Sequence, residues 1–599
     1  MPRTADPDQE FRVSIHVTKG YRYASTQPSF LDKETGERRY RHVHWGKVDA
    51  QNKFIPGKEY LLASIEERKK LIFPPDWDIS EIFKLSVHAN QTVLPVVTQD
   101  EDKLYGDVWL LEQRALSTLV REDLAKVFSG NLEMVDIVLT IAYFMKCCNG
   151  APYNQLADWQ DIEKTPFATR LTSSFITKAL QKIKSKHRAA FLKLRIERMS
   201  KNACCPVDST SRSAWGHSLC EVDFGYNKDG LPLPQTIEVV TYSLTDHVPV
   251  YYRTFQGNMA DVRSFSPVVN ELESLGFKDG VLITDRGYQS MNNIDELIDR
   301  DMPAIMGTKT SLKFVKETIR ELGEIKHHPE SMELDPHNRI YYRQYNLEYE
   351  FTSKNKNTAV KARDLRLNLY FDPAKHNDAI TDIEVKTAIQ GQLLNLHVSN
   401  KTPLPDSDEA INEEYGYYDI DYDKTTRLVK GYSINNKKYE NKKLLAGFYA
   451  NVTHKVNLTA TEAQNHYKLR DEQEKYYAMM KGFLGCDRQR NWSEAAKEGC
   501  RFVLFVAQIL GCTLANERKT KLKQFDSIGE ILRAMRPIRF ISHPGTDPYM
   551  TPFVSKQVEI CQKLNIPIPK GCAPQYAETA EPGRRRGRPR KITVTPSNS

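Results

Sequence analysis

The spacing of apolar residues divides the first third of the chain into a strand-like part and a helical part. Residues 11–60 alternate between apolar and polar, most clearly from Arg12 to Val17, and we expect a small β unit there. From Leu104 to Cys148 the apolar residues recur every three or four positions, which predicts helices. Phe175 to Met199 has the same period and is strongly basic, so one long helix is expected there. Its basic face would either lie on phosphates or simply be solvated.

The pattern changes again at Ala203, where short apolar runs alternate with helical stretches. Ala203 to Val207 is typical of a short strand that ends at Asp208. The expected elements after it are strands at Thr236–Ser243 and Val248–Phe255, a helix from Asp261 through Leu275, a strand at Gly280–Thr284 ending at Asp285, a helix at Asn292–Asp301 and a strand at Ala304–Gly307. Three meander strands followed by helix, strand, helix and strand give the element order of a ribonuclease H-like α/β domain.

The stretch from Thr318 to Lys455 has strand-like alternation, as at Leu365, Leu367, Leu369 and Phe371, and predicts a β-rich insertion. Within it, the acidic run from Asp419 to Asp423 lacks the glycine and the glutamate of a calcium-binding loop, so we expect it on the face of a strand. After the insertion, Trp492–Cys512 and Ile528–Met535 have the apolar pattern of packed helices.

A helix from Thr459 to Gly482 is expected to align a set of polar side chains. Thr459 and Glu462 form a capping box at its start. At about 100° per residue, four polar residues share a stripe roughly 60° wide: Tyr467, Arg470, Glu474 and Lys481. The neighbouring arc would pack beside a sheet edge and comprises Leu469, Tyr476, Tyr477 and Met480. An acid flanked by two cations and a phenol suits a metal-bound phosphodiester, although solvated helices also carry such charges.

Composition narrows the class of protein. The chain has 599 residues, 40% of them hydrophobic, and a net charge of +8, which suggests a globular protein of several domains. Its longest apolar runs are shorter than a membrane span, and the ten cysteines lack the spacing of a zinc site. The C-terminal tail from Glu581 onward supplies +5 of the +8 charge, which indicates contact with a polyanion.

The spacing of Tyr467, Arg470, Glu474 and Lys481 resembles the YREK signature of DDE transposases of the insertion-sequence-four superfamily. The resemblance covers roughly residues 203–512, including Asp285-Arg286-Gly287 after an apolar strand and a β insertion before the glutamate. It implies a ribonuclease H-like core interrupted by a β-rich insertion, with a mixed β then helical N-terminal region and a disordered basic C-terminal tail.

The resemblance also implies a catalytic set of three carboxylates, namely Asp208, Asp285 and Glu474. Three carboxylates suffice to hold two Mg²⁺ ions, for which Mn²⁺ is expected to substitute, about 4 Å apart. Tyr467, Arg470 and Lys481 would grip the terminal phosphates. Asp208 is the least secure member, and Asp223, in Glu221-Val222-Asp223-Phe224-Gly225, remains an alternative first acid.

The tail residues Arg586, Gly587, Arg588, Pro589 and Arg590 resemble an AT-hook. An extended Gly-Arg-Pro core fits a narrow minor groove, where negative potential attracts arginine. A generic basic tail is the alternative, and it would bind DNA as well.

We therefore expect a DNA transposase that binds terminal inverted repeats and target DNA, as a dimer or higher oligomer, in the cytoplasm on the nucleoid and with no membrane segment. The alternatives are a non-catalytic, domesticated DNA-binding regulator and a structure-specific nuclease on the same fold. The expected segments are an N-terminal region that binds DNA ends (1–200), the two core parts (201–317 and 444–545), the β-rich insertion (318–443) and the tail (546–599).

Overall fold

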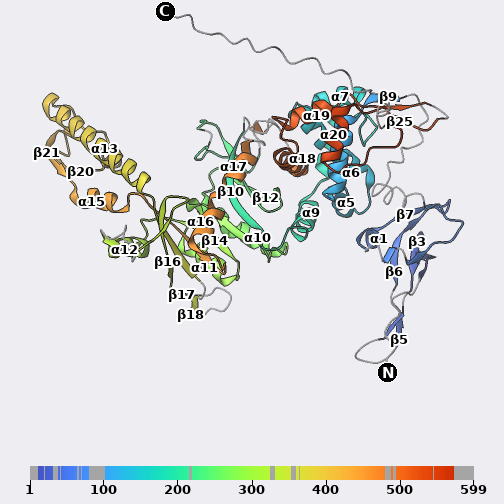
Figure 1. The fold of residues 1–599 in the computed structure, drawn as a ribbon, viewed down its shortest axis with the longest axis horizontal. Coiled ribbons are helices and arrows are strands. Elements are labelled where there is room, and N and C mark those ends of the chain that lie inside the picture. Colours follow the sequence, from blue (N-terminus) through green and yellow to red (C-terminus); the bar gives the residue numbers. More distant parts are fainter. Residues whose placement is uncertain are drawn as a thin grey trace, which may run out of the picture. The chain divides into compact units, whose positions relative to one another are not determined.

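The chain folds as two compact units, the first formed by residues 1–179 with 513–599 and the second by residues 180–512. The computed structural model, drawn in Figure 1, describes residues 11–18, 20–27, 29–31, 38–40, 42–63, 67–68, 70–79, 101–214, 219–228, 230–323, 331–352, 359–362, 365–478, 488–489, 494–543 and 546–572.

The first unit contains a small four-stranded antiparallel sheet, which confirms the predicted N-terminal β unit. The strand order is β2 (Ser14–Thr18), β3 (Tyr21–Thr26), β6 (Val43–Val48) and β7 (Phe54–Pro56). Helix α1 (Lys58–Leu62) follows the last strand. The core of this subdomain consists of Val13, Ala24, Val48, Phe54, Tyr60, Leu71 and Trp77.

The rest of the first unit is largely helical, as the apolar spacing predicts. It comprises α4 (Gly106–Ser117), α5 (Val120–Val127), α6 (Leu132–Cys147), α7 (Leu156–Ile162), α19 (Ile528–Met535) and α20 (Ser555–Lys563), beside a sheet of β9 (Glu101–Leu104), β24 (Arg539–Ser542) and β25 (Tyr549–Met550). Folded structure therefore extends to residue 572, well into the segment predicted to be a tail, because Phe553, Ile560 and Cys561 are buried.

A ten-stranded mixed sheet forms the centre of the second unit (Figure 1). Three strands form an antiparallel meander: β10 (Cys204–Ala214), β11 (Gln235–Ser243) and β12 (Val248–Gln256). Parallel to β10 run β13 (Val281–Thr284) and then β14 (Ala304–Thr308). Helices α10 (Asp261–Ser274) and α11 (Met291–Asp299) connect β12 to β13 and β13 to β14. This order of strands and helices confirms the prediction.

Strand β10 differs from the prediction, since it continues for six residues beyond Asp208. The reason is its second partner. β10 pairs with β13 only as far as Val207, but with β11 from Val207 to Ser213. Asp208 therefore lies where one side of the strand loses its partner.

The segment predicted to be a β-rich insertion is mixed, and part of it completes the main sheet. After α12 (Lys313–Leu322), three of its strands, β15 (Glu333–Asp335), β16 (Ile340–Asn346) and β19 (Leu365–Phe371), join that sheet, while β17 (Tyr349–Thr352) and β18 (Ala359–Ala362) form a hairpin. A 28-residue helix, α13 (Pro373–Asn400), follows β19. It forms because Asp372 accepts hydrogen bonds from the first-turn N–H groups of Ala374 and Lys375, and because proline is favoured at the first helical position.

Figure 1 shows α13 grouped with a hairpin of β20 (Tyr418–Tyr422) and β21 (Val429–Ile434) and with α15 (Asn436–Leu445), after the short helix α14 (Asp408–Glu414). The acidic run that begins at Asp419 lies on β20, as predicted. The chain returns to the main sheet through β22 (Phe448–His454), which lies between β14 and β19.

The predicted helix Thr459–Gly482 is two helices, α16 (Ala460–Lys468) and α17 (Asp471–Ala478). At the junction, hydrogen bonds span three residues instead of four, as in Glu472 N–H to Leu469 O and Gln473 N–H to Arg470 O. On one straight helix, the buried residues of the two parts would face directions roughly 140° apart, so a break is needed to bury both. Leu469, predicted to pack, is half exposed, and Met480 lies outside the described residues.

The predicted basic helix is also two helices, α8 (Ser173–Lys182) and α9 (Ser185–Glu197). Here too the buried residues of the two parts would face different directions on one straight helix. Its arginines do not form an open phosphate-binding face. Arg195 is buried, and Arg188 forms an ion pair with Glu271 and donates to the carbonyl of Tyr252.

Helix α18 (Glu494–Thr520) is longer than its predicted extent. Its Ala496–Thr520 part is the one helix in the described part of the chain that is long and apolar enough to cross a membrane. Most of it is buried within the protein, with 78% of its most apolar window covered. A core helix of a folded domain passes the same test.

Candidate active site

Asp208 and Asp285 lie side by side in the main sheet of the second unit. β10 and β13 pair in parallel with Val207 opposite Thr284, and each aspartate is the next residue along its strand. Neighbouring strands are about 4.8 Å apart, so the two residues are direct neighbours. The sequence order alone predicts that both acids end central strands, and the parallel register brings them together.

The junction between α16 and α17 supplies two hydrogen-bond donors to Asp285. The guanidinium Nη1 of Arg470 lies 2.8 Å from Asp285 Oδ1, and the hydroxyl of Tyr467 donates to the same oxygen at 3.2 Å. Gly307 on β14 leaves room for the phenol, because a Cβ at that position would stand 2.5 Å from Tyr467 Oη. Two residues of the predicted polar stripe therefore meet one of the predicted acids.

Glu474 lies one turn beyond Arg470 and is not brought against the aspartates. Its Oε1 is 4.0 Å from Arg470 Nη2, and 62% of its side chain is exposed. The guanidinium thus bridges Asp285 and Glu474. Within the described ranges, no three His, Cys, Asp or Glu side chains are placed to hold a metal ion.

Lys228 and Asp261 complete the cluster, and neither residue was predicted from the sequence to belong to the site. The ammonium of Lys228 lies 2.6 Å from Ser209 Oγ, 3.3 Å from Asp261 Oδ2 and 4.0 Å from Asp208 Oδ1. It also donates to the carbonyl of Ser209. The hydroxyl of Ser209 donates to Asp261 Oδ1 at 2.5 Å. A lysine from the β10–β11 loop and the first residue of α10 therefore hold the residue that follows Asp208.

The two aspartates have pKa values shifted in opposite directions. Burial raises the pKa of Asp208, an effect that the Lys228 ammonium and the N–H of Ser209 oppose only in part. Burial also acts on Asp285, but Arg470 and the N–H of Arg286 outweigh it and hold the pKa of Asp285 below its usual value. Burial and the neighbouring Asp285 raise the pKa of Tyr467 to about 12, so its hydroxyl remains a hydrogen-bond donor at neutral pH.

Tyr477 ties α17 to the site, since its buried hydroxyl donates to the carbonyl of Asp208 at 2.7 Å. On the same helix, the side-chain amide of Gln473 donates to the carbonyl of Val240 on β11. These contacts hold α17 against β10 and β11. Glu474 lies at the flank of this buried face and is mostly exposed.

Asp223, the alternative first acid, has a different role in the structure. Its Oδ1 accepts the N–H of Phe224 and its Oδ2 accepts the side-chain amide of Asn258. Its backbone forms an isolated bridge with Gln235. The carboxylate of Asp223 therefore holds a loop, whereas Asp208 lies beside Asp285.

The other predicted site residues, Lys481, Arg586, Gly587, Arg588, Pro589 and Arg590, lie outside the described residues.

The carboxylate groups at this site are suitable ligands for a hard divalent cation, and two of the three predicted ligands are in place. Carboxylate oxygens are the ligands that Mg²⁺ prefers, and Asp208 and Asp285 are adjacent. Arg470 and Lys228 place two cationic groups against these carboxylates, so bound metal would take over charge that the two side chains now balance. Glu474 would need to move past Arg470 to join such a site.

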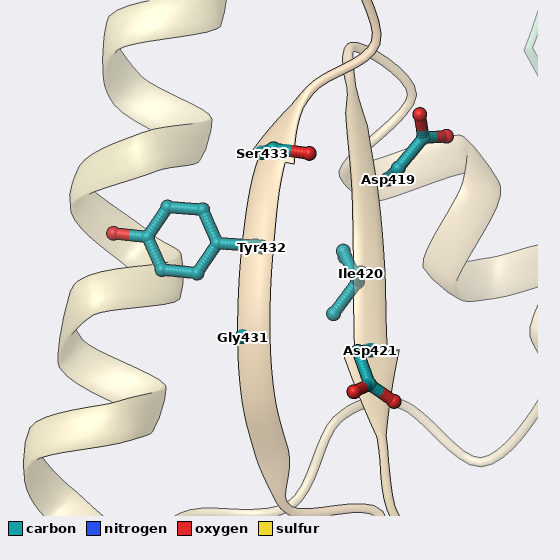
Figure 2. Close-up of a pocket in the computed structure, with 6 residues that line it drawn as sticks. All are labelled: Asp419, Ile420, Asp421, Gly431, Tyr432 and Ser433. Atoms are coloured by element: carbon teal, nitrogen blue, oxygen red, sulfur yellow. The ribbon is translucent and has the colours of Figure 1, made fainter.

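A shallow hollow on the β20–β21 hairpin carries two further acids (Figure 2). It is lined by Asp419, Ile420, Asp421, Gly431, Tyr432 and Ser433. Figure 2 shows Tyr432 pointing toward α13, where its hydroxyl donates to Asn395, while Asp419 and Asp421 point to the opposite side. None of its lining residues belongs to the Asp208–Asp285 cluster.

Comparison with known proteins relates this geometry to a family. A family model described as "Transposase DDE domain" matches residues 208–507, which is 300 of the 599 residues. Among solved structures, a cryo-EM structure of a piggyBac transposase synaptic complex with hairpin DNA covers 81% of this chain and 90% of its own chain, with 8% identity and a TM-score of 0.34. A search among curated proteins finds no match. The matched segment begins at Asp208 and contains Asp285 and Glu474.

Proposed function

Because this chain belongs to the family of proteins with a transposase DDE domain, we propose that it is an active DNA transposase of the insertion-sequence-four superfamily with a ribonuclease H-like core. It binds the terminal inverted repeats of its element, cuts the DNA at the ends and joins the freed 3′-OH ends to target DNA. The adjacency of Asp208 and Asp285 on parallel strands, with Arg470 and Tyr467 reaching Asp285, carries the proposal.

The three acids would hold divalent metal ions, which DDE transposase domains generally use. We assign Asp208, Asp285 and Glu474 as ligands of two Mg²⁺ ions, with Mn²⁺ able to substitute. Metal ions held there would supply activation of the attacking water or 3′-OH and stabilisation of the leaving oxygen. Tyr467 and Arg470 are hydrogen-bond donors beside Asp285, and in this reading they turn to the phosphate oxygens of the DNA end. We assign Lys481 to the same phosphate from its place in the sequence pattern.

Other parts of the chain would bring DNA to this site. We assign residues 1–200 to binding of the DNA ends and residues 586–590 to an AT-hook in the minor groove. The acting species is a dimer or higher oligomer on DNA, and the protein works in the cytoplasm on the nucleoid. We place the catalytic core in the second unit, residues 180–512, whose main sheet includes strands β15, β16 and β19 of the segment 318–443.

Incubation with DNA tests the proposal directly. The purified protein is mixed with a labelled duplex that carries the inverted repeats flanking its gene, a supercoiled plasmid as target, and either Mg²⁺ or EDTA. We expect nicks at the repeat boundary and labelled DNA joined to the plasmid with Mg²⁺, and neither product with EDTA. Cutting without joining would favour a structure-specific nuclease. Binding with no cutting in Mg²⁺ or Mn²⁺ would favour a DNA-binding regulator and overturn the proposal.

Substitution of Lys228 tests whether its contacts to Ser209 and Asp261 position Asp208. We expect Lys228→Met to lower cleavage by roughly 10- to 100-fold, the usual effect of removing a group that orients a metal ligand. The reason is that Ser209 loses its contact to the ammonium while Asp261 loses its nearest cation. Initial rates of end cleavage at saturating Mg²⁺ measure the effect.

The control is Lys278→Met, which removes an exposed lysine of the same unit and should leave the rate unchanged. Lys228→Arg keeps the charge and should recover part of the activity. If Lys228→Met cuts as fast as the wild type, the lysine does not support Asp208.

A further inference from the structure

One face of the N-terminal sheet is exposed and lined by rings. Antiparallel partners point to the same side of a sheet, and His16 pairs with Tyr23, which pairs with Lys47. Ser25 pairs with His44 on the same face. The opposite face carries Ala24, Thr26 and Val48, which are buried. The centre of that opposite face is packed, while Ile15 and Val17 of the edge strand β2 are exposed on it.

The rings on the exposed face form a continuous cluster. The ring centroid of His44 lies 5.3 Å from that of Tyr23 and 5.6 Å from that of His16, and His16 lies 5.0 Å from His42. At the edge of the cluster, Lys47 Nζ stands 5.5 Å from the ring centroid of Tyr21, whose side chain is 60% exposed. We call His16, Tyr21, Tyr23, His42, His44 and Lys47 the ring face.

The charge of these strands has one sign. β2, β3 and β6 contain no aspartate or glutamate, and their charged residues are Arg22 and Lys47, of which Lys47 belongs to the ring face. The carboxylate of Asp49, at the end of β6, is occupied by the N–H groups of Gln51 and Lys53 in the next turn. A partner for this face therefore has flat apolar surfaces and negative charge, which together describe nucleotides.

A metal site is the other chemistry that three histidines suggest, and the contacts of the rings favour binding of a flat ligand instead. His44 Nδ1 is hydrogen-bonded to Ser25 Oγ at 2.7 Å, and His42 Nε2 to the amide of Gln27 at 2.6 Å. His42 and His44 are stacked with 24° between their planes. In the part of the chain that the structure describes, no three such side chains converge on one point.

We propose that the ring face binds unpaired nucleotides of DNA, by stacking bases on Tyr23 and the histidines and by placing phosphates near Lys47. Stacking requires a base face that is free of its duplex neighbours, so the ligand is a single strand or a frayed end. Transposition exposes such strands when an element end is cut. The inference rests on the proposed function for its choice of DNA, and it assigns that ligand to a surface distant in sequence from the catalytic acids.

Binding of the full-length chain to a fluorescent 12-nucleotide oligo-dT tests the ring face, because this probe has no sequence of the element and needs no metal. We expect Tyr23→Ala and His44→Ala each to weaken binding by about 5- to 100-fold. Tyr23→Phe keeps the ring and should bind as the wild type does. Lys47→Gln should flatten the dependence of log affinity on log salt concentration by about 0.7, the slope of one lost phosphate contact on a single strand.

The matched control is Tyr549→Ala, which removes a half-exposed tyrosine from β25 of the same unit and should change affinity by less than about twofold. Thermal unfolding of each variant confirms that the sheet is intact. Unchanged oligo-dT binding by Tyr23→Ala and His44→Ala would overturn the inference. So would a loss in Tyr23→Phe equal to that in Tyr23→Ala, since the hydroxyl and not the ring would then be responsible.

Failure of the inference and failure of the proposed function give different results. Oligo-dT carries no repeat of the element and needs no metal, so its binding is measured independently of cleavage. If the protein binds oligo-dT through the ring face but never cuts the repeat duplex, the inference about the ring face holds and the proposed transposase activity is wrong. If the protein cuts the repeat duplex but its oligo-dT binding does not depend on the rings, the proposed activity holds and the inference about the ring face is wrong.

Discussion

Replacing Asp208 or Asp285 with asparagine is expected to lower DNA cleavage by at least about 10³-fold, because an amide has nearly the same shape as a carboxylate but cannot supply its charge to a divalent cation. The two residues are neighbours across the parallel pair β10 and β13, so each loss should remove a ligand from one shared site. Initial rates of end cleavage and of strand joining measure the effect. Affinity for the repeat duplex, measured in EDTA, should change little.

Asp223→Asn is the matched control, since Asp223 was the other acid that the sequence left open. Its carboxylate bonds to Phe224 N–H and to the amide of Asn258, so the substitution weakens a loop contact worth about 1 kcal/mol. We expect cleavage within about fivefold of the wild type. A large loss in Asp223→Asn together with an active Asp208→Asn would reverse the assignment of the first acid.

The position of each aspartate after a strand-forming run was predictable because its causes are local. Asp208 and Asp285 each follow an apolar run that is long enough for one strand, and a helix connects the antiparallel meander to the strand before Asp285. Register was not predictable from the pattern. The extension of β10 past Asp208 depends on pairing with β11, whose first residue lies 27 positions further along the chain.

The continuous polar stripe from Tyr467 to Lys481 predicts one helix, whereas the buried residues of its two halves require a break between α16 and α17. Ala460, Ala463 and Gln464 pack in one direction, whereas Gln473, Tyr476 and Tyr477 pack in another. Comparing those buried faces would have predicted the break. The effect on the site is large, since the break lets Arg470 and Tyr467 share Asp285 while Glu474 stays outside.

Helix α13 and the contacts of Lys228 were not predicted from the sequence, for two different reasons. In α13 the buried Ile383 and Leu394 lie on one face, but the exposed Ile389 and Leu396 lie on another, so no single apolar stripe marks the helix. Lys228 is one lysine among many in the sequence. Its importance comes only from Ser209 and Asp261, which lie on other elements and meet it through the tertiary fold.

Glu474→Gln is expected to lower DNA cleavage by about 10³-fold or more, as for the two aspartates, while leaving the fold intact. Glu474 is mostly exposed, and its ion-pair partner among the described residues is Arg470 at 4.0 Å, so the wild-type side chain contributes little to stability. A loss of activity would therefore report on catalysis. The matched control is Glu472→Gln on the same helix, which removes an acid paired with Lys475 and should leave cleavage within about threefold.

Thermal unfolding with added Mn²⁺ gives a second measurement that does not depend on DNA cutting. A ligand that binds the folded state raises its stability by RT ln(1 + [L]/Kd), so a metal site that uses Glu474 should give a smaller Mn²⁺-dependent rise in Tm for Glu474→Gln than for the wild type or Glu472→Gln. Equal shifts in all three proteins, with Glu474→Gln still cutting, would exclude Glu474 as the third ligand. Equal shifts with cutting lost would also exclude Glu474 as a metal ligand and would make it a residue that positions Arg470, whose guanidinium contacts both Glu474 and Asp285.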